Sequence, residues 1–291
     1  MMKRTRTMLT FVSILFLVFG LSACGPEEEK DSDAETAPTL PPESSMVMDF
    51  SNLSESATAK LDGKSLGLGN ELLSHGLLTN YHYAAGHVLV WNVALWANMA
   101  IPVAALRESF NHLPTRQSDG TWVWSYTVTV VNEVYVASLH GKVSGSNVNW
   151  SMYVTKEGVY ADYLWFSGVS ALDGTNGTWA LNYSIADATP TPLLDVSWQK
   201  DDTAGTLELR FTSKITNSGV SVGDYVEYAV TGGSPYDARY HISIADNLTE
   251  IEWNRTDKNG RVQDEGHYGA LGWYCWDSLK ADDVSTASCT P

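Results

Sequence analysis

Two spacings of hydrophobic residues divide the chain into a helical part and a strand-rich part. Within residues 70–113, apolar side chains recur every three or four positions, which is the period of one face of an α-helix. These positions are Leu77, Tyr81, Ala84, Val88, Trp91, Leu95 and Met99. Because Pro102 lacks a backbone donor and clashes with the turn before it, we expect one helix to end near Ala100 and a shorter one to run over residues 102–111.

Residues 88–106 are apolar on almost every side, since Asn92 and Asn98 are their only polar side chains. A helix of this kind must be surrounded by apolar material. A membrane span is one alternative, but the two asparagines, Pro102 and the lack of a flanking basic cluster count against it. We therefore expect the helix to be buried against the protein's own sheet.

Within residues 120–275 the hydrophobic period changes to two, as in strands with one buried face. The alternating apolar positions are Trp122, Trp124, Tyr126, Val128 and Val130; Val148, Trp150, Met152 and Val154; Trp179, Leu181, Tyr183 and Ile185; Leu207, Leu209 and Phe211; and Val226, Tyr228 and Val230. Turn signals such as Asn176-Gly177 and Gly232-Gly233 separate these runs. The pattern predicts about nine to eleven antiparallel strands joined as a meander.

The predicted fold class is α+β and mainly antiparallel β, a curved meander sheet or barrel that clasps the N-terminal apolar helices. Nine of the eleven tryptophans lie in the β region, and bulky inward side chains favour a sheet curved around a filling. This architecture resembles in outline the half-barrel carriers of the LolA, LolB and LppX kind, which hold lipid beneath helical lids. We expect an apolar ligand between helix and sheet, lined by Trp91, Leu95, Trp96, Trp150 and Met152.

The first 23 residues have the organisation of a secretion signal, with a basic start and an apolar run from Met8 to Leu21. The next residues, Leu21-Ser22-Ala23-Cys24, resemble the lipobox of bacterial lipoproteins. The resemblance implies that residues 1–23 are removed and that acylated Cys24 anchors the protein to a membrane. Gly25, rather than Asp, favours the outer membrane by the same resemblance. An ordinary signal peptide with a coincidental cysteine is the alternative.

Residues 24–47 are acidic, rich in Pro and Ser and free of aromatic side chains, so we predict a solvated tether there. Residues 48–291 are predicted to form a single globular domain. It comprises the helical segment 70–113, the meander 120–275 and a polar tail, 276–291.

Composition and charge exclude several classes of function. The chain is 44% hydrophobic, with 18 Lys and Arg against 34 Asp and Glu and a net charge of −16. Such an acidic chain is unsuited to binding nucleic acid, which requires clustered basic side chains. We find no nucleotide-binding, zinc-binding or calcium-binding spacing, and therefore predict no cofactor and no metal.

If Cys24 is acylated, Cys275 and Cys289 are the two remaining cysteines. A protein of the cell envelope folds under oxidising conditions, so we predict that these two form a disulfide that fixes the tail. A loop of about 15 residues closed in this way stabilises a fold by roughly 3 kcal/mol. A reactive Cys–His site is the alternative, without a thiol-activating motif to support it.

No catalytic motif is found, and the sequence leaves two groups of polar and aromatic residues open to interpretation. Glu227, Arg239, His241, Glu250 and Glu252 lie on neighbouring late strands, where they fit either an acid–base site or cross-strand ion pairs. Another group, composed of Trp165, Trp198 and Trp253, fits either sugar stacking or core packing.

The sequence therefore predicts a non-enzymatic, membrane-anchored envelope lipoprotein that binds an apolar or lipid-like ligand. Two alternatives stay open: a protein-interaction module with a solid core, acting through loops such as 170–177 or 232–239, and a surface carbohydrate-binding protein. No protein partner is identifiable.

Overall fold

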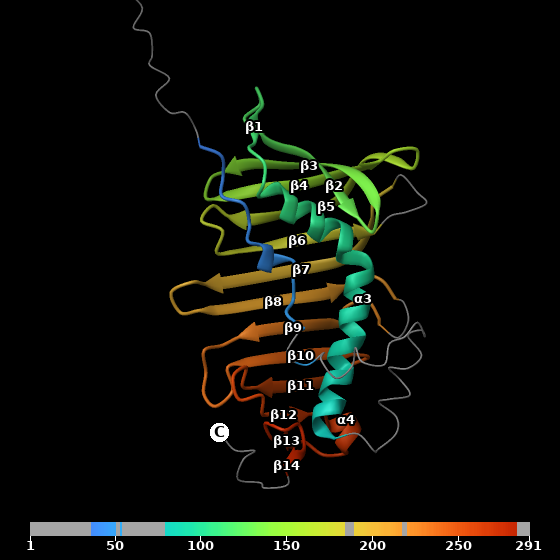
Figure 1. The fold of residues 1–291 in the computed structure, drawn as a ribbon, viewed down its shortest axis with the longest axis vertical. Helices are drawn as coiled ribbons and strands as arrows, with labels where there is room; N and C mark the ends of the chain where they lie inside the picture. The colour runs from blue at the N-terminus through green and yellow to red at the C-terminus, as the bar shows by residue number, and fades with distance from the viewer. Residues whose placement is uncertain (1–35, 51–52, 54–78, 184–188, 217–219, 284–291) are drawn as a thin grey trace, which may run out of the picture. The chain divides into compact units, whose positions relative to one another are not determined.

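A computed structural model describes residues 36–50, 53, 79–183, 189–216 and 220–283. The leader and Cys24 lie outside these residues. The described residues from Ala37 onward form one compact unit, built on an antiparallel sheet in which every strand pairs with the next one in the chain (Figure 1). The strands are β1 Thr115–Arg116, β2 Trp122–Val130, β3 Glu133–Ser144, β4 Asn147–Lys156, β5 Tyr160–Ala171, β6 Asn176–Tyr183, β7 Thr191–Asp201, β8 Thr206–Ser213, β9 Tyr225–Val230, β10 Ala238–Ile244, β11 Asn247–Trp253, β12 Gly260–Gln263, β13 Tyr274–Trp276 and β14 Asp282–Asp283.

The prediction of a mainly antiparallel meander is confirmed, and of its two alternatives, an open sheet or a barrel, the barrel is wrong. The sheet is open, because β1 and β14 stand at its two ends and do not pair with each other. It therefore does not enclose a helix as a barrel would. It also has 14 strands rather than about nine to eleven, because strands of two or three residues, such as β1, β13 and β14, are too short to show an alternating pattern.

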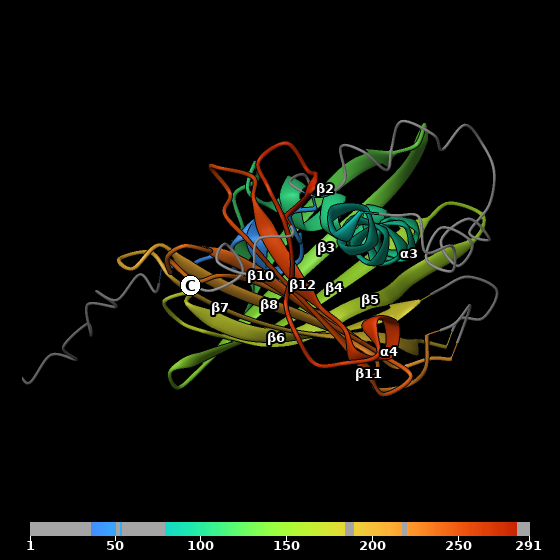
Figure 2. The same ribbon diagram turned by 90° about the horizontal axis from the view of Figure 1, so that it is seen from below.

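One long helix, α3, spans Asn80–Ser109 and crosses the strands on one face of the sheet (Figures 1 and 2). Its first turns contact β12 and β13, and its last turns contact β2 and β3. Thr79 caps its N-terminus, since Thr79 Oγ1 accepts a hydrogen bond from the His82 backbone N–H at 3.3 Å. Among the described residues, no helix has the length and apolar character needed to span a membrane.

The predicted break at Pro102 is wrong, because α3 continues through it. The helix axis changes direction toward its C-terminal end (Figure 1), which is how a helix accommodates an internal proline. Packing of this apolar segment against the sheet outweighs the lost hydrogen bond.

Most positions that the alternating pattern assigned to the core are buried, whereas Trp122, Val130 and Leu207 are half-buried. The side chains of Tyr183 and Ile185 lie outside what the structure describes. On β2, Trp124, Tyr126 and Val128 are buried while Ser125, Thr127 and Thr129 are exposed. The predicted helical face is buried too, at Tyr81, Ala84, Val88, Trp91, Leu95 and Met99. Leu77 lies outside the described residues.

The compact unit begins earlier than predicted, at Ala37 rather than at residue 48. Residues 37–50, which we call the strap, run along the same face of the sheet as α3 and include a short 3-10 helix, η1, at Glu43–Ser45 (Figure 2). Met46 and Met48 of the strap are only 2% and 5% exposed. The acidic and Pro-rich composition of this segment predicted a solvated tether, and its few apolar side chains were too sparse to indicate burial.

Tryptophans on the buried face lie directly opposite glycines on the neighbouring strand. The cross-strand pairs are Gly141–Trp150, Gly168–Trp179, Gly177–Trp198 and Gly260–Trp276. A Cβ added at Gly141 would lie 2.6 Å from the Trp150 ring, and one at Gly168 would lie 2.5 Å from the Trp179 ring. Each indole therefore lies over a position that only glycine leaves open.

This close packing predicts that Gly168→Ala destabilises the fold by about 1–3 kcal/mol, the usual cost of overpacking a core. The added methyl group would also collide with the Thr178 carbonyl oxygen. Gly272→Ala is the matched control, because the nearest atom to its Cβ would be 4.0 Å away. Urea unfolding of both variants measures the difference, and equal loss in the two would contradict the packing argument.

Candidate functional site

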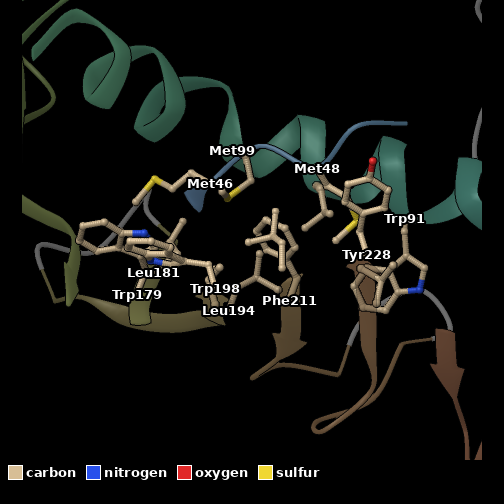
Figure 3. Packing of buried hydrophobic residues seen from close by; sticks show 14 of the residues in the cluster. Met46, Met48, Trp91, Met99, Trp179, Leu181, Leu194, Trp198, Phe211 and Tyr228 are labelled. Carbon is tan, nitrogen blue, oxygen red and sulfur yellow. The ribbon is translucent and has the colours of Figure 1, made fainter. Parts of the chain in front are cut away.

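The layer between α3 and the sheet contains four of the five residues predicted to line a ligand site, and Figure 3 shows part of this layer, including Trp91. Trp91 and Leu95 on α3 are 2% and 5% exposed, while Trp150 and Met152 on β4 are 1% and 0% exposed. All four belong to one continuous apolar cluster. Trp96 also lies on α3, and its side chain is outside what the structure describes.

The strap inserts into this layer and brings flexible side chains with it. Figure 3 shows Met46 and Met48 between α3 and the strands, beside Met99 of the helix. The Trp179 Nε1–H donates to Ser45 Oγ at 3.1 Å, and the Tyr240 hydroxyl donates to the Asp49 carbonyl. An ion pair between Arg107 of α3 and Glu43 completes the attachment. The strap belongs to no strand of the sheet, so side-chain contacts hold it.

Several tryptophans in the core bury an indole N–H that has no hydrogen-bond acceptor. Of those described, the unpaired Nε1 atoms belong to Trp91, Trp122, Trp165, Trp198 and Trp253. By contrast, the Trp150 Nε1–H donates to Ser170 Oγ at 2.9 Å. Burying a donor without an acceptor costs about 1–3 kcal/mol of stability. A purely apolar core would therefore leave the hydrogen-bonding capacity of several indole N–H groups in this layer unused.

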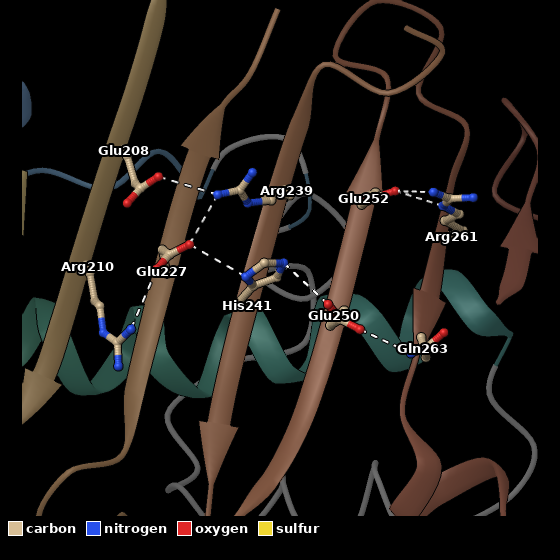
Figure 4. Close-up of polar contacts among 9 residues, drawn as sticks. All are labelled: Glu208, Arg210, Glu227, Arg239, His241, Glu250, Glu252, Arg261 and Gln263. Atoms are coloured by element: carbon tan, nitrogen blue, oxygen red, sulfur yellow. Dashed lines mark hydrogen bonds and ion pairs between the residues drawn. The ribbon is translucent and has the colours of Figure 1, made fainter. Parts of the chain in front are cut away.

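The opposite face of the late strands carries a network of ion pairs (Figure 4). His241 on β10 lies directly opposite Glu227 on β9 and Glu250 on β11. Its Nδ1 is 3.5 Å from Glu227 Oε1, and its Nε2 is 3.6 Å from Glu250 Oε1. Arg239 Nη2 lies 3.4 Å from Glu227 Oε1, and Arg210 Nη1 lies 3.7 Å from Glu227 Oε2.

The contacts of Glu227 explain why its carboxylate stays ionised although it is largely buried. Its side chain is only 12% exposed, and burial alone would raise its pKa. The hydrogen bond to His241 and the nearby Arg239 outweigh burial and hold the pKa of Glu227 below its ordinary value. A carboxylate kept ionised between cations is a poor proton shuttle, and the register places these charges opposite one another. The cross-strand interpretation of this group therefore fits the geometry better than an acid–base site.

A second polar cluster is buried where α3 meets α4 (Glu265–Tyr268). Asp264, with 0% exposure, accepts hydrogen bonds from the Tyr83 hydroxyl at 2.7 Å and from Asn247 Nδ2 at 3.0 Å. It also caps α4 by accepting from the His267 backbone N–H at 3.0 Å. Burial would raise the pKa of Asp264, but hydrogen bonds led by that from Thr249 hold it below its ordinary value. The cluster ties α3 to the C-terminal part of the sheet.

His87 packs beside this cluster and has a buried ring nitrogen without a partner. Its ring meets that of Tyr83 edge to face, with centroids 4.7 Å apart, and its Nε2 has no hydrogen-bond partner. Burial lowers the pKa of His87 to about 4, against the opposing effect of the Asp264 carboxylate. His87 is therefore neutral at neutral pH.

The structure brings together only some of the other predicted residues. Cys275 on β13 is 2% exposed, but Cys289 and Cys24 lie outside the described residues, so the disulfide and the lipid anchor stay predictions. The three tryptophans considered for sugar stacking are 5%, 3% and 1% exposed. The interpretation of Trp165, Trp198 and Trp253 as a surface stacking platform is therefore wrong. Within the described ranges, no three His, Cys, Asp or Glu residues are placed to hold a metal ion.

No family model, no curated protein and no solved structure matches this chain. The resemblance to the half-barrel carriers therefore stays an expectation from the sequence.

The environment of His87 predicts a specific loss of stability in acid. Below pH about 6.5 the unfolded chain binds a proton at this histidine, whereas the native protein does not until pH about 4. Over that window the wild type should lose up to about 1.4 kcal/mol per pH unit relative to His87→Gln. Urea unfolding at several pH values measures the difference. Exposed His82→Gln is the control, and parallel curves for wild type and His87→Gln would contradict the assignment.

Proposed function

We propose that this protein is an envelope lipoprotein, anchored through Cys24, that binds an apolar or lipid-like ligand between α3 and the sheet. The anchor is supported by the signal-like leader and by the sequence Leu21-Ser22-Ala23-Cys24. The ligand site is supported by one observation above all: unpaired indole N–H groups are buried in the layer that the strap occupies.

The chemistry of this layer suits an amphiphile better than a pure hydrocarbon. Trp91 on the helix and Trp198 on the sheet belong to the same apolar cluster, and each has an unpaired Nε1–H. Ester, carboxylate or amide oxygens of a lipid would accept from these donors and remove their desolvation cost. The methionines nearby have three rotatable bonds each and repack easily around a chain of different shape. Binding would require the strap to move aside.

A solid-core interaction module is the second candidate, and the fit of tryptophans over glycines favours it. Trp150 and Trp179 are 1% and 2% exposed, and both indole N–H groups are paired within the protein. On this view, the strap is a permanent part of the core, and recognition occurs at the surface.

The lipid anchor is tested by labelling cells with a clickable palmitate analogue. The full chain should incorporate the label and partition into the membrane fraction, whereas Cys24→Ser should do neither, because that thiol is the proposed acyl acceptor. Cys289→Ser is the control variant and should label like the wild type. An unlabelled wild-type chain would refute the proposed lipid anchor without bearing on the proposed ligand site.

The ligand site is tested by native mass spectrometry of the full chain, purified in mild detergent and offered phosphatidylethanolamine or palmitate. We expect a stoichiometric, non-covalent adduct, which organic extraction removes. Trp198→Phe keeps the apolar ring but loses the unpaired donor, so it should weaken binding by about tenfold, the equivalent of one hydrogen bond.

Trp276→Phe is the matched control for this experiment, because Trp276 is not among the residues expected to line the ligand and its Nε1–H already donates to the Lys258 carbonyl oxygen at 3.0 Å. It should retain the adduct even if the fold is somewhat less stable. A bare mass for the wild type at every lipid concentration would refute the ligand site and favour the solid-core module.

A further inference from the structure

Strand β2 has an open edge over most of its length. It pairs with β3 along all nine residues, Trp122–Val130. On its other side β1 pairs only with Trp122 and Val123. Among the residues that the structure describes, residues 124–130 therefore end the sheet without a neighbouring strand.

The register shows which backbone groups face this edge. The tight turn at Val131–Asn132, where both residues have positive φ, makes Val130 and Glu133 a hydrogen-bonded pair. Alternation along an antiparallel ladder then directs the even-numbered residues of β2 to β3 and the odd-numbered ones away from it. The Gln117 N–H donates to the Thr121 carbonyl at 2.7 Å, which agrees with odd-numbered residues facing away from β3. Ser125, Thr127 and Thr129 thus point their N–H and C=O groups outward.

This edge lacks the features by which proteins protect an exposed strand. Residues 124–130 contain no charge and no proline, and the pairing with β3 has no bulge. The outward residues Ser125, Thr127 and Thr129 are all exposed. The opposite edge differs, since β14 has only two residues and both are Asp, which would repel a second copy of itself.

Exposed apolar side chains lie at both ends of the open edge. Leu113, just before β1, is 93% exposed, and Phe110 at the end of α3 is 47% exposed. At the other end, Val131 is 74% exposed, and Val134 on β3, just after the turn, is 59% exposed. Val131, at the tip of the turn, is β-branched and has a φ of 49°. This backbone conformation is unfavourable for a β-branched side chain, and such strain is typical of segments that have a functional role.

We propose that β2 pairs antiparallel with β2 of a second copy of this chain, which joins the two sheets edge to edge. A two-fold axis at Thr127 would place Ser125 of one copy opposite Thr129 of the other. These uncharged pairs include β-branched Thr, which favours strand pairing, and no like charges meet. The same axis brings the Val131 end of one copy beside the Leu113 end of the other, so the exposed apolar groups cover each other.

Disulfide trapping of the full chain in its native envelope tests this pairing. At the two-fold axis the two Thr127 Cα atoms would be about 5.5 Å apart, within the range that a disulfide spans. Thr127→Cys should give a dimer band on a non-reducing gel, well above any band from the wild type. Val136→Cys is the control: it is exposed, but it lies one strand farther from the axis in each copy and should not cross-link.

A second variant, Thr127→Pro, removes the N–H that points outward and leaves the ladder to β3 intact. Purified in mild detergent, the wild type should sediment as a dimer and Thr127→Pro as a monomer with an unchanged circular dichroism spectrum. A monomeric wild type, equal cross-linking at positions 127 and 136, or a cross-link from position 127 to a different protein would each overturn the proposal.

Discussion

Close packing of tryptophan over glycine on one face of the sheet is the constraint on which the rest of this structure depends. In four cross-strand pairs, among them Gly168 with Trp179, the missing side chain of one strand makes room for the indole of the next. The indoles then pack flat against the sheet, and the aromatic surface that they form must be shielded from water. Helix α3 and the strap provide that cover, so the apolar character of α3 follows from the sheet beneath it.

The two faces of the sheet are held by different kinds of interaction. Under α3, burial of large aromatic side chains supplies the main stabilisation. On the outer face of β8 to β12, Arg and Glu side chains alternate across strands, with His241 between Glu227 and Glu250. These pairs are only partly exposed, but the gain from each attraction is offset by the cost of removing its charges from water. Their main effect is to fix the register of the strands, because a slip of one residue in the pairing would turn every charged side chain toward the core.

The strap connects the proposed anchor to the proposed ligand site. Only about a dozen residues separate Cys24 from Ala37, where the compact unit begins, and a chain of that length spans at most about 40 Å. The same strap places Met46 and Met48 in the layer that a ligand would occupy. Binding a lipid and releasing the strap would therefore be one event, close to the membrane. Two copies joined through β2 would hold two such layers in one continuous sheet.

The sequence by itself determined the type and the buried face of most elements, because the periods of two and 3.6 are local properties of the backbone. The buried faces of β2, β4 and β9 and the buried side of α3 could be read from it. It also indicated that Glu227, His241 and Glu250 share neighbouring strands. Only the tertiary structure decided that the sheet stays open, that α3 continues through Pro102 and that the strap is buried. These depend on contacts between residues far apart in the chain, such as Trp179 with Ser45 and Tyr83 with Asp264, and no local pattern encodes such pairs.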